Sequence, residues 1–283
     1  MEKIKPKKSL GQHFLNDKNI LLRIAGSINC SDSDIIIEIG PGTGALTEYI
    51  LNKVPKHLFS VEIDKRAVEA LYKSFPVDKL NNFDIINSDI RNINIRNLLS
   101  EYGFDDNIIK VIGNIPYNIS ADIFFWIFNQ SNIIDKAVLM VQKEVAQRLC
   151  AKPRTKSYGI LTVAVNVTGS CKTLFDVSPE CFFPKPKVTS SVIEIMLENN
   201  KFNQMNFKTI MNIVKSAFSH RRKVIRNSMK SYFTNEGIDF SEFQKIHNTK
   251  YPDYFSKRAE ELSPEDFIKL YHSISEFKDR KNQ

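Results

Sequence analysis

The chain has 283 residues, 42% of them hydrophobic, and a formal net charge of +8, which permits one or two packed domains and a polyanionic partner. No run approaches the roughly 18 apolar residues of a transmembrane helix, and no apolar signal region follows the basic start of the chain. Four cysteines without a C-x-x-C pair argue against a metal site or a disulfide framework. We therefore expect a cytoplasmic protein with no metal and no membrane span.

The first predicted element follows a basic arm of about 16 residues and runs into a glycine turn. Residues 35–39 are apolar apart from Glu38, and Gly40-Pro41-Gly42-Thr43-Gly44 comes directly after them. Residues 45–51 then have the pattern of a helix. Strand, glycine turn and helix open a doubly wound α/β unit, in which glycines let the backbone turn tightly and a ligand approach. We expect Gly40 to lie at a cofactor.

The next two predicted strands each deliver an acidic residue. The strand at residues 58–63 contains Glu62, roughly 20 residues beyond the glycine turn, which is the spacing of an acid that binds ribose hydroxyls. The strand at residues 84–87 leads to Asp89, at the carboxyl end where open α/β sheets bind ligands. We therefore predict that Glu62 binds a ribose and that Asp89 lies next to an adenine amine.

The spacing of the glycines distinguishes two classes of cofactor. A dinucleotide fingerprint has its third glycine one residue further on, where helix and strand pack around a pyrophosphate. S-adenosylmethionine has no pyrophosphate and needs acids for its ribose, adenine amine and ammonium groups. The pattern therefore favours S-adenosylmethionine over a nicotinamide dinucleotide. Two roles are open for Glu38: it lies near the ammonium group of the cofactor, or it anchors the N-terminal arm.

The fourth predicted strand, residues 108–113, runs directly into Asn114-Ile115-Pro116-Tyr117. The Asn114 side chain and the Ile115 carbonyl can both accept hydrogen bonds from an exocyclic amino group. Pro116 stiffens this loop and removes a competing donor. Tyr117 offers a ring on which a flipped-out base can stack. The alternative is a plain strand end with a proline turn, and the cofactor pattern upstream favours the base-binding interpretation.

Strand and helix patterns continue to alternate up to about residue 197. We expect an amphipathic helix at residues 119–128 and three further strands, at residues 137–141, 159–167 and 191–197. This alternation predicts a Rossmann-like α/β fold, a seven-stranded parallel sheet with helices on both faces. The catalytic domain is expected to cover residues 1–200, with a polar linker at residues 198–201.

The remainder, residues 201–283, is predicted to form a small helical domain that binds RNA. Residues 207–218 have apolar positions at helical spacing, and Ser263 followed by Pro264 is a typical helix start. This part carries 16 Lys and Arg against 10 Asp and Glu, whereas the first 200 residues carry 24 against 22. Four basic residues in it are expected to share a helix face: Arg221, Arg222, Lys223 and Arg226. Phosphate contacts are favoured for them over a merely solvated face.

Four short motifs resemble, in the same order, those of class I S-adenosylmethionine-dependent methyltransferases that act on N6 of adenine. They are E-I-G-P-G-T-G, V-E-I-D, N-S-D and N-I-P-Y. The chain is most similar to the small-subunit ribosomal RNA adenine dimethyltransferases, the KsgA-like enzymes. The resemblance extends nearly end to end. It includes segments at residues 8–15, 141–145 with 157–159, 182–188, 217–223 and 258–262.

The resemblance implies an enzyme that transfers methyl groups from S-adenosylmethionine to N6 of two adjacent adenosines near the 3′ end of 16S rRNA. The partner is then the small ribosomal subunit, the role is in its biogenesis, and the protein is a monomer. The family's N-terminal box adds His13 and Leu15 as residues that cover the cofactor, although many relatives have Asn in place of His13. Asn114 is expected to contact the cofactor as well as the acceptor. Phe182 is expected to close the second face of the target base, the alternative being ordinary packing beside a proline-rich loop.

Two other classes of function are considered. Relatives that methylate large-subunit rRNA generally lack the Gln142-Lys143-Glu144 segment and the Arg221-Arg222-Lys223 run, which are present here, and DNA enzymes typically carry D/N-P-P-Y. A non-catalytic nucleic-acid-binding factor has no physical reason to keep the glycine turn, both acids and the residue 114–117 loop. The small-subunit enzyme is therefore favoured.

Overall fold

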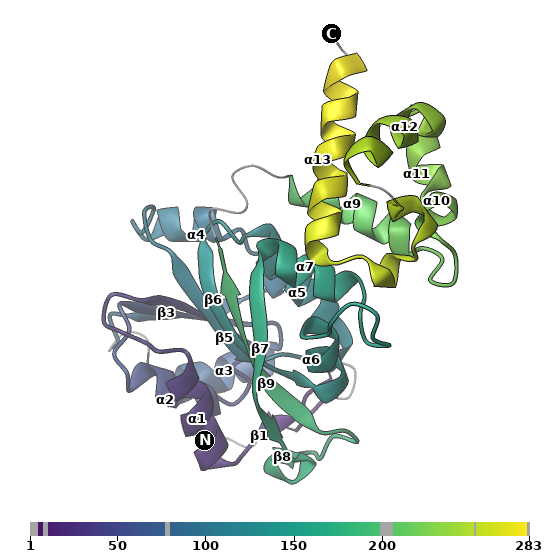
Figure 1. Ribbon diagram of the computed structural model, residues 1–283. Coiled ribbons are helices and arrows are strands. Elements are labelled where there is room, and N and C mark those ends of the chain that lie inside the picture. Colours follow the sequence, from purple (N-terminus) through teal and green to yellow (C-terminus); the bar gives the residue numbers. More distant parts are fainter. Residues whose placement is uncertain (1–4, 8–10, 77–79, 199–205, 252, 282–283) are drawn as a thin grey trace. The chain divides into compact units, whose positions relative to one another are not determined.

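The computed structural model describes residues 5–7, 11–76, 80–198, 206–251 and 253–281 (Figure 1). The chain divides into two compact units, Met1–Ala146 with Ser170–Asn199, and Gln147–Gly169 with Asn200–Gln283. The boundary expected near residue 200 stays a prediction, and this division differs from it by grouping residues 147–169 with the C-terminal part. The proposed linker at residues 198–201 lies, apart from Glu198, outside the described residues.

A seven-stranded mixed sheet forms the centre of the first unit, with helices on both faces (Figure 1). Its strands, in spatial order, are β4 (Phe83–Asn87), β3 (His57–Glu62), β2 (Ile35–Ile39), β5 (Ile109–Asn114), β6 (Ile134–Gln142), β9 (Ser190–Leu197) and β7 (Gly169–Val177). Adjacent strands from β4 to β6 are parallel, and β6 pairs with β9 in antiparallel fashion. A short antiparallel pair, β1 (Phe14–Leu15) and β8 (Phe182–Phe183), lies apart from this sheet in the described part of the unit.

The helices of the first unit follow the strands in an alternating order. They are α1 (Lys18–Ser27), α2 (Ala45–Leu51), α3 (Lys65–Ser74), α4 (Ile95–Glu101) and α5 (Ser120–Asn129), with short 3₁₀ turns η3 (Ile90–Asn92), η4 (Tyr117–Ile119) and η5 (Pro179–Cys181). α6 (Lys143–Leu149) begins in this unit. Asp17 and Asp64 begin α1 and α3 by accepting backbone N–H groups of the first turn.

The position of the site follows from the order of the strands. β2 lies between β3 and β5, so the chain leaves β2 towards β4 on one side and returns to β5 on the other. Ligands bind at such a switch point, outside the carboxyl ends of the strands. The register fixes a close approach here, because Gly113 pairs with Ile39 and a Cβ at Gly113 would lie 2.5 Å from the Ile39 carbonyl oxygen. β2 and β3 are buried along their whole length, as central parallel strands are.

One strand prediction is wrong. Residues 159–167, expected as the sixth strand, form helix α7 (Ile160–Thr168), and the strand lies just beyond it as β7. Six of the nine residues of α7 are buried, so its sequence lacks a polar face that would reveal the helical period. A short apolar run of this kind does not distinguish a buried helix from a buried strand. The expectation of an all-parallel sheet is also corrected, because β9 is antiparallel to β6.

The second unit is helical, as predicted. α7 packs with α9 (Phe207–Phe218) and α13 (Pro264–Lys281). The described part of this unit also contains α10 (Ile225–Ser228), α11 (Lys230–Asn235), α12 (Phe240–Lys250), η6 (Tyr254–Ser256) and η7 (Ala259–Glu261). The Ser263 hydroxyl accepts the Asp266 backbone N–H at 3.2 Å, which confirms the expected start of α13. Within the described part of the chain, every helix is too short or too polar to cross a membrane.

Candidate cofactor and acceptor site

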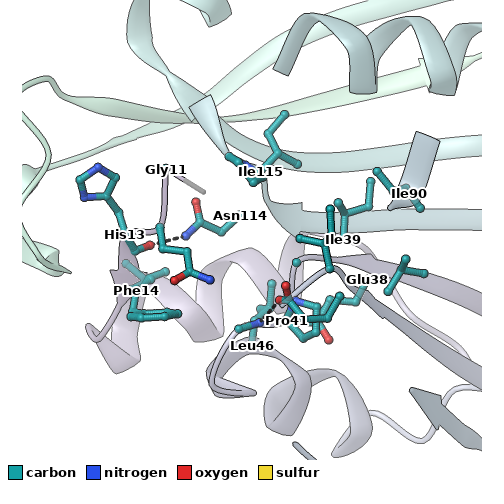
Figure 2. A pocket seen from close by; sticks show the side chains of 18 of the residues that line it. Gly11, His13, Phe14, Glu38, Ile39, Pro41, Leu46, Ile90, Asn114 and Ile115 are labelled. Atoms are coloured by element: carbon teal, nitrogen blue, oxygen red, sulfur yellow. Dashed lines mark hydrogen bonds between the residues drawn. The ribbon is translucent and has the colours of Figure 1, made fainter. Parts of the chain in front are cut away.

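A cavity lies at the carboxyl edge of the sheet in the first unit (Figure 2). Its walls come from β1, from the turn between β2 and α2, and from the ends of β3, β4 and β5. Eight of the residues expected from the sequence line it: His13, Leu15, Gly40, Glu62, Asp89, Asn114, Pro116 and Tyr117. The expected cofactor residues and the expected acceptor loop therefore share one cavity.

The glycine turn depends on backbone conformations that favour glycine. Gly40, Gly42 and Gly44 have φ angles of +65°, +57° and +83°. A Cβ at Gly42 would also lie 2.9 Å from the Phe14 ring, which covers the turn from the N-terminal arm. The turn is joined to the neighbouring strand by the Gly40 N–H, which donates to the Val61 carbonyl at 3.0 Å.

Glu62 lies at the end of β3 and is only 5% exposed. Its two carboxylate oxygens accept the backbone N–H groups of Gly42, at 3.1 Å, and Asp64, at 2.9 Å. Burial raises the pKa of the carboxyl group, and these two amide bonds oppose the rise. Each carboxylate oxygen has a second lone pair, so the fixed group can still accept hydrogen bonds from two adjacent hydroxyls.

Asp89 is held by a neighbour that the sequence analysis did not identify. The Arg91 guanidinium donates to both Asp89 oxygens, with Nε–Oδ1 at 3.0 Å and Nη2–Oδ2 at 2.6 Å, and reaches Asp122 on α5 at 3.0 Å. These side-chain bonds hold the pKa of Asp89 below its usual value. Asp89 is thus kept as an ionised acceptor, which is the form suited to an adenine amine.

Glu38 lines the same cavity and is 1% exposed. Its Oε2 atom accepts the hydroxyls of Thr47 and Ser60, each at 2.7 Å. Burial raises the pKa of Glu38 to about 7. Thr47 belongs to α2 and Ser60 to β3, so the alternative in which Glu38 anchors the N-terminal arm is not supported.

The arm is anchored instead at Asp64, directly after β3. Asp64 accepts the Arg66 guanidinium at 2.6 Å and the Gln12 side-chain amide at 3.0 Å, and the Lys7 ammonium lies 3.8 Å away. The bonds from Arg66 are the main cause that lowers the pKa of Asp64 to about 2. Sequence reasoning missed this anchor, because Gln12 and Asp64 are separated by 52 positions in the chain.

Asn114 connects the arm to the acceptor loop. Its side-chain NH₂ donates to the His13 carbonyl at 2.9 Å (Figure 2). A carbonyl can only accept, so this bond fixes the orientation of the amide and leaves the Asn114 Oδ1 as an acceptor. The following residue is held by a hydrogen bond from the Ile115 N–H to the Met140 carbonyl, at 3.3 Å.

Tyr117 and His13 form a stacked pair of rings. Their centroids are 5.5 Å apart and their planes differ by 24°. The Tyr117 hydroxyl is hydrogen-bonded to the Ser190 hydroxyl at 2.6 Å, and the His13 Nδ1 atom donates to the Pro184 carbonyl at 2.7 Å. A base that stacks on Tyr117 therefore uses its other face or takes the place of the imidazole.

The expectation that Phe182 closes the second face of the target base stays a prediction. In this structure its side chain is 3% exposed and packs in the hydrophobic core. Its neighbour Phe183 is 63% exposed. Successive residues of a strand point to opposite faces, so the choice between the two rings depends on how β8 pairs with β1, which the sequence does not reveal.

The basic residues expected to share a helix face do not lie on one helix. α9 ends at Phe218, Arg221 and Arg222 lie in a turn, Lys223 lies in a bend, and Arg226 lies in α10. All four are exposed. Arg221 donates to the Glu260 carboxylate and to the Lys156 carbonyl, each at 2.7 Å, so it holds segments of the second unit together.

Comparison with known proteins gives consistent matches. Residues 3–275 match the model of the family "Ribosomal RNA adenine dimethylase". The chain is 40% identical over 272 residues to ribosomal RNA small subunit methyltransferase A of Sulfurihydrogenibium sp., covering 96% of this chain and 97% of that protein. It is 37% identical over 273 residues to the protein of the same name from Francisella tularensis subsp. novicida, covering 96% and 99%.

Two solved structures are similar over most of the chain. A dimethyladenosine transferase from Plasmodium falciparum is 26% identical with a TM-score of 0.76, over 91% of this chain and 95% of that chain. The 23S rRNA methyltransferase ErmE is 20% identical with a TM-score of 0.65, over 93% and 99%, and this likeness concerns the fold alone.

Proposed function

Because the chain belongs to the ribosomal RNA adenine dimethylase family, we propose that it transfers methyl groups from S-adenosylmethionine to N6 of adenine in small-subunit ribosomal RNA. It is a methyltransferase of the S-adenosylmethionine-dependent class. The observation that supports the proposal is the single cavity in which the glycine turn and two acids meet the Asn114–Tyr117 loop. A cofactor and an amino group can approach each other there.

The lining of the cavity fits S-adenosylmethionine by its chemistry. The fixed carboxylate of Glu62 suits two ribose hydroxyls, and the ionised Asp89 suits the adenine amine. Ile63 and Ile90 offer apolar surface beside them. When bound, S-adenosylmethionine supplies an electrophilic methyl group on a positively charged sulfur.

The acceptor loop accounts for the activation of the amino group. The lone pair of adenine N6 is delocalised into the ring, which makes this nitrogen a poor nucleophile. Hydrogen bonds from its two N–H groups to Asn114 Oδ1 and the Ile115 carbonyl draw it towards tetrahedral geometry. Positioning of this kind lowers a barrier by about 7–11 kcal/mol in good cases. No general base is assigned, because the amino proton becomes acidic as the nitrogen gains positive charge.

We propose that the targets are two adjacent adenosines near the 3′ end of 16S rRNA, that the enzyme acts as a cytoplasmic monomer without a metal ion, and that it serves small-subunit biogenesis. Arg222, Lys223 and Arg226 are exposed and available for phosphate contacts. Arg221 is assigned a positioning role, since Glu260 already binds it.

The proposal is tested by the choice of nucleic acid. S-adenosylmethionine with a labelled methyl group is incubated with the enzyme and, separately, with unmodified small subunits, large subunits and adenine-containing duplex DNA. We expect label in small-subunit RNA alone. Label confined to large subunits or to DNA would favour the corresponding relatives, and no transfer to any of the three would support a non-catalytic binding factor.

A further inference from the structure

A second cavity adjoins the first one. Its described lining residues are Lys5, Pro6, Gly11, Gln12, His13, Tyr117, Gln142, Phe183, Pro184, Lys185, Pro186, Lys187 and Val188. Gly11, Gln12, His13 and Tyr117 also line the first cavity, so the two share the wall formed by the arm and the acceptor loop. The function derived above does not use this second cavity.

The lining combines an exposed aromatic ring with positive charge. Phe183 and Val188 are 63% and 45% exposed, although both are large apolar side chains. Three lysines lie around them, and the described lining contains neither Asp nor Glu. Aromatic rings that stack bases, together with cations that bind phosphates, are typical of sites for single-stranded nucleic acid.

The ring of Phe183 is held in place by its backbone. Phe183 pairs with Phe14 in the β1–β8 ladder, and its neighbour Phe182 is anchored in the core. The hydrogen bond from His13 to the Pro184 carbonyl fixes the next residue. The ring is therefore presented to solvent by a segment fixed on both sides, which reduces the entropy lost when a base stacks on it.

We propose that the second cavity holds the nucleotide next to the target adenosine, with its base on Phe183 and its phosphate near Lys187 and Lys5. The target itself must bring N6 to Asn114 in the first cavity, so the next nucleotide of an unpaired strand enters across the shared wall. Lys185 forms an ion pair with Glu180 in which both side chains are mostly exposed, and such pairs exchange readily for a phosphate. This inference rests on the proposed function.

The first test compares the kinetics of variants on unmodified small subunits. Phe183→Ala should lower kcat/KM for subunits roughly 5- to 150-fold, the factor that corresponds to about 1–3 kcal/mol for stacking one base. Phe183→Trp should restore activity, and the affinity for S-adenosylmethionine should stay unchanged in both variants. Leu22→Ala, which removes a side chain of similar exposure from α1, is the matched control and should behave as wild type.

The second test identifies the partner of the ring. Small subunits carrying an abasic residue immediately 5′ or 3′ of the target are assembled and methylated by wild type and by Phe183→Ala. At one of the two abasic positions, kcat/KM of the wild type should fall by the same factor as kcat/KM of Phe183→Ala falls on intact subunits. The variant acting on those abasic subunits should lose little more than either change alone. The inference would be overturned if the free-energy losses from the abasic position and from Phe183→Ala added in full, or if kcat/KM of Phe183→Ala were unaltered. Either result, with a wild type that methylates intact subunits, would leave the proposed function intact. A wild type that fails to methylate intact subunits would overturn both.

The salt dependence of binding tests the proposed phosphate contacts of Lys5 and Lys187 independently. Binding of small subunits by Lys5→Ala/Lys187→Ala should have a flatter salt dependence, by about 0.7 in the logarithmic slope for each phosphate contact to a single strand. An unchanged slope would exclude these two residues from the proposed phosphate site.

Discussion

At the residue scale, the acceptor loop depends on an amide held in one orientation. The Asn114 NH₂ group donates to the His13 carbonyl, so the oxygen of the same side chain is directed away from the arm and remains an acceptor. The Asn114 side chain thus has two roles: its NH₂ group binds the arm, and its oxygen binds the amino group of the acceptor.

Asn114→Ala should lower kcat by roughly 10²–10³-fold, the scale found when one positioned hydrogen-bonding group is removed from an active site. Its affinity for S-adenosylmethionine should change far less than kcat, because the glycine turn, Glu62 and Asp89 remain. Single-turnover kinetics and calorimetry measure the two quantities. Asn129→Ala, at the exposed end of α5, is the control. A variant that methylates at nearly the wild-type rate would refute the hydrogen-bond mechanism.

Glu62→Gln tests the cofactor assignment with little change in shape. The carboxylate accepts two backbone N–H groups, whereas an amide offers one acceptor oxygen and directs its NH₂ against the second N–H. We expect the dissociation constant for S-adenosylmethionine to rise by the equivalent of about 1–3 kcal/mol. Titration with NADH should give no binding to either protein. Tight NADH binding by the wild type would contradict the assignment.

At the element scale, the close approach of β2 and β5 places the glycine turn beside the acceptor loop. Gly113→Ala should destabilise the protein by about 1–3 kcal/mol, because the new Cβ would meet the Ile39 carbonyl at 2.5 Å, where the backbone must shift. Urea unfolding measures the loss. Gly26→Ala in α1 is the matched control, since beyond its chain neighbours and the backbone of its own helix no described atom lies within 4 Å of the added Cβ, and it should be neutral or slightly stabilising. Equal stabilities of the two variants would contradict this packing argument.

The helical unit contains a histidine that is costly to protonate. His247 is 1% exposed, both its ring nitrogens lack a hydrogen-bond partner among the described residues, and aromatic rings surround it. Burial lowers the pKa of His247 to about 4. The unfolded chain then binds more protons than the folded one between about pH 6.5 and pH 4, so the free energy of unfolding should fall as pH drops through this window.

His247→Leu should remove this part of the pH dependence. Between pH 7 and pH 4, the free energy of unfolding of the wild type should fall by about 1–3 kcal/mol more than that of the variant. Denaturant unfolding at several pH values measures it, and His272→Leu, at an exposed position of α13, should retain the wild-type slope. An identical pH dependence for all three proteins would show that His247 does not titrate as described.

At the scale of the whole molecule, the residues that the sequence predicts best are those that follow a strand. Gly40, Glu62, Asp89 and Asn114 each stand at or just after the end of a strand, and parallel strands bring their carboxyl ends to one edge. What the sequence does not predict depends on contacts between distant positions. Examples are the Gln12–Asp64 bond and the pairing of β8 with β1, which buries Phe182 and exposes its neighbour. The buried helix α7 was missed because its apolar run carries no period.

The excess positive charge of the C-terminal part gives a prediction about the complex with the subunit. Neutralising Arg222, Lys223 and Arg226 should weaken the binding of small subunits and flatten its salt dependence by somewhat under one unit for each lost phosphate contact. Binding of S-adenosylmethionine and the melting temperature should be unchanged. Arg221→Ala should behave differently and lower the melting temperature, because it removes the bonds to Glu260 and Lys156. An unaltered salt slope for the triple variant would refute the RNA contacts.

We conclude that one cavity delivers methyl groups from S-adenosylmethionine to adenine N6 in small-subunit RNA. Its most direct test is mass spectrometry of nucleosides from unmodified small subunits treated with wild type or with Asn114→Ala, followed by mapping of the modified positions. We expect N6,N6-dimethyladenosine at two adjacent nucleotides near the 3′ end of 16S rRNA with wild type, and almost none with the variant. Methylation of another base or another atom by wild type, or equal yields from both proteins, would contradict it.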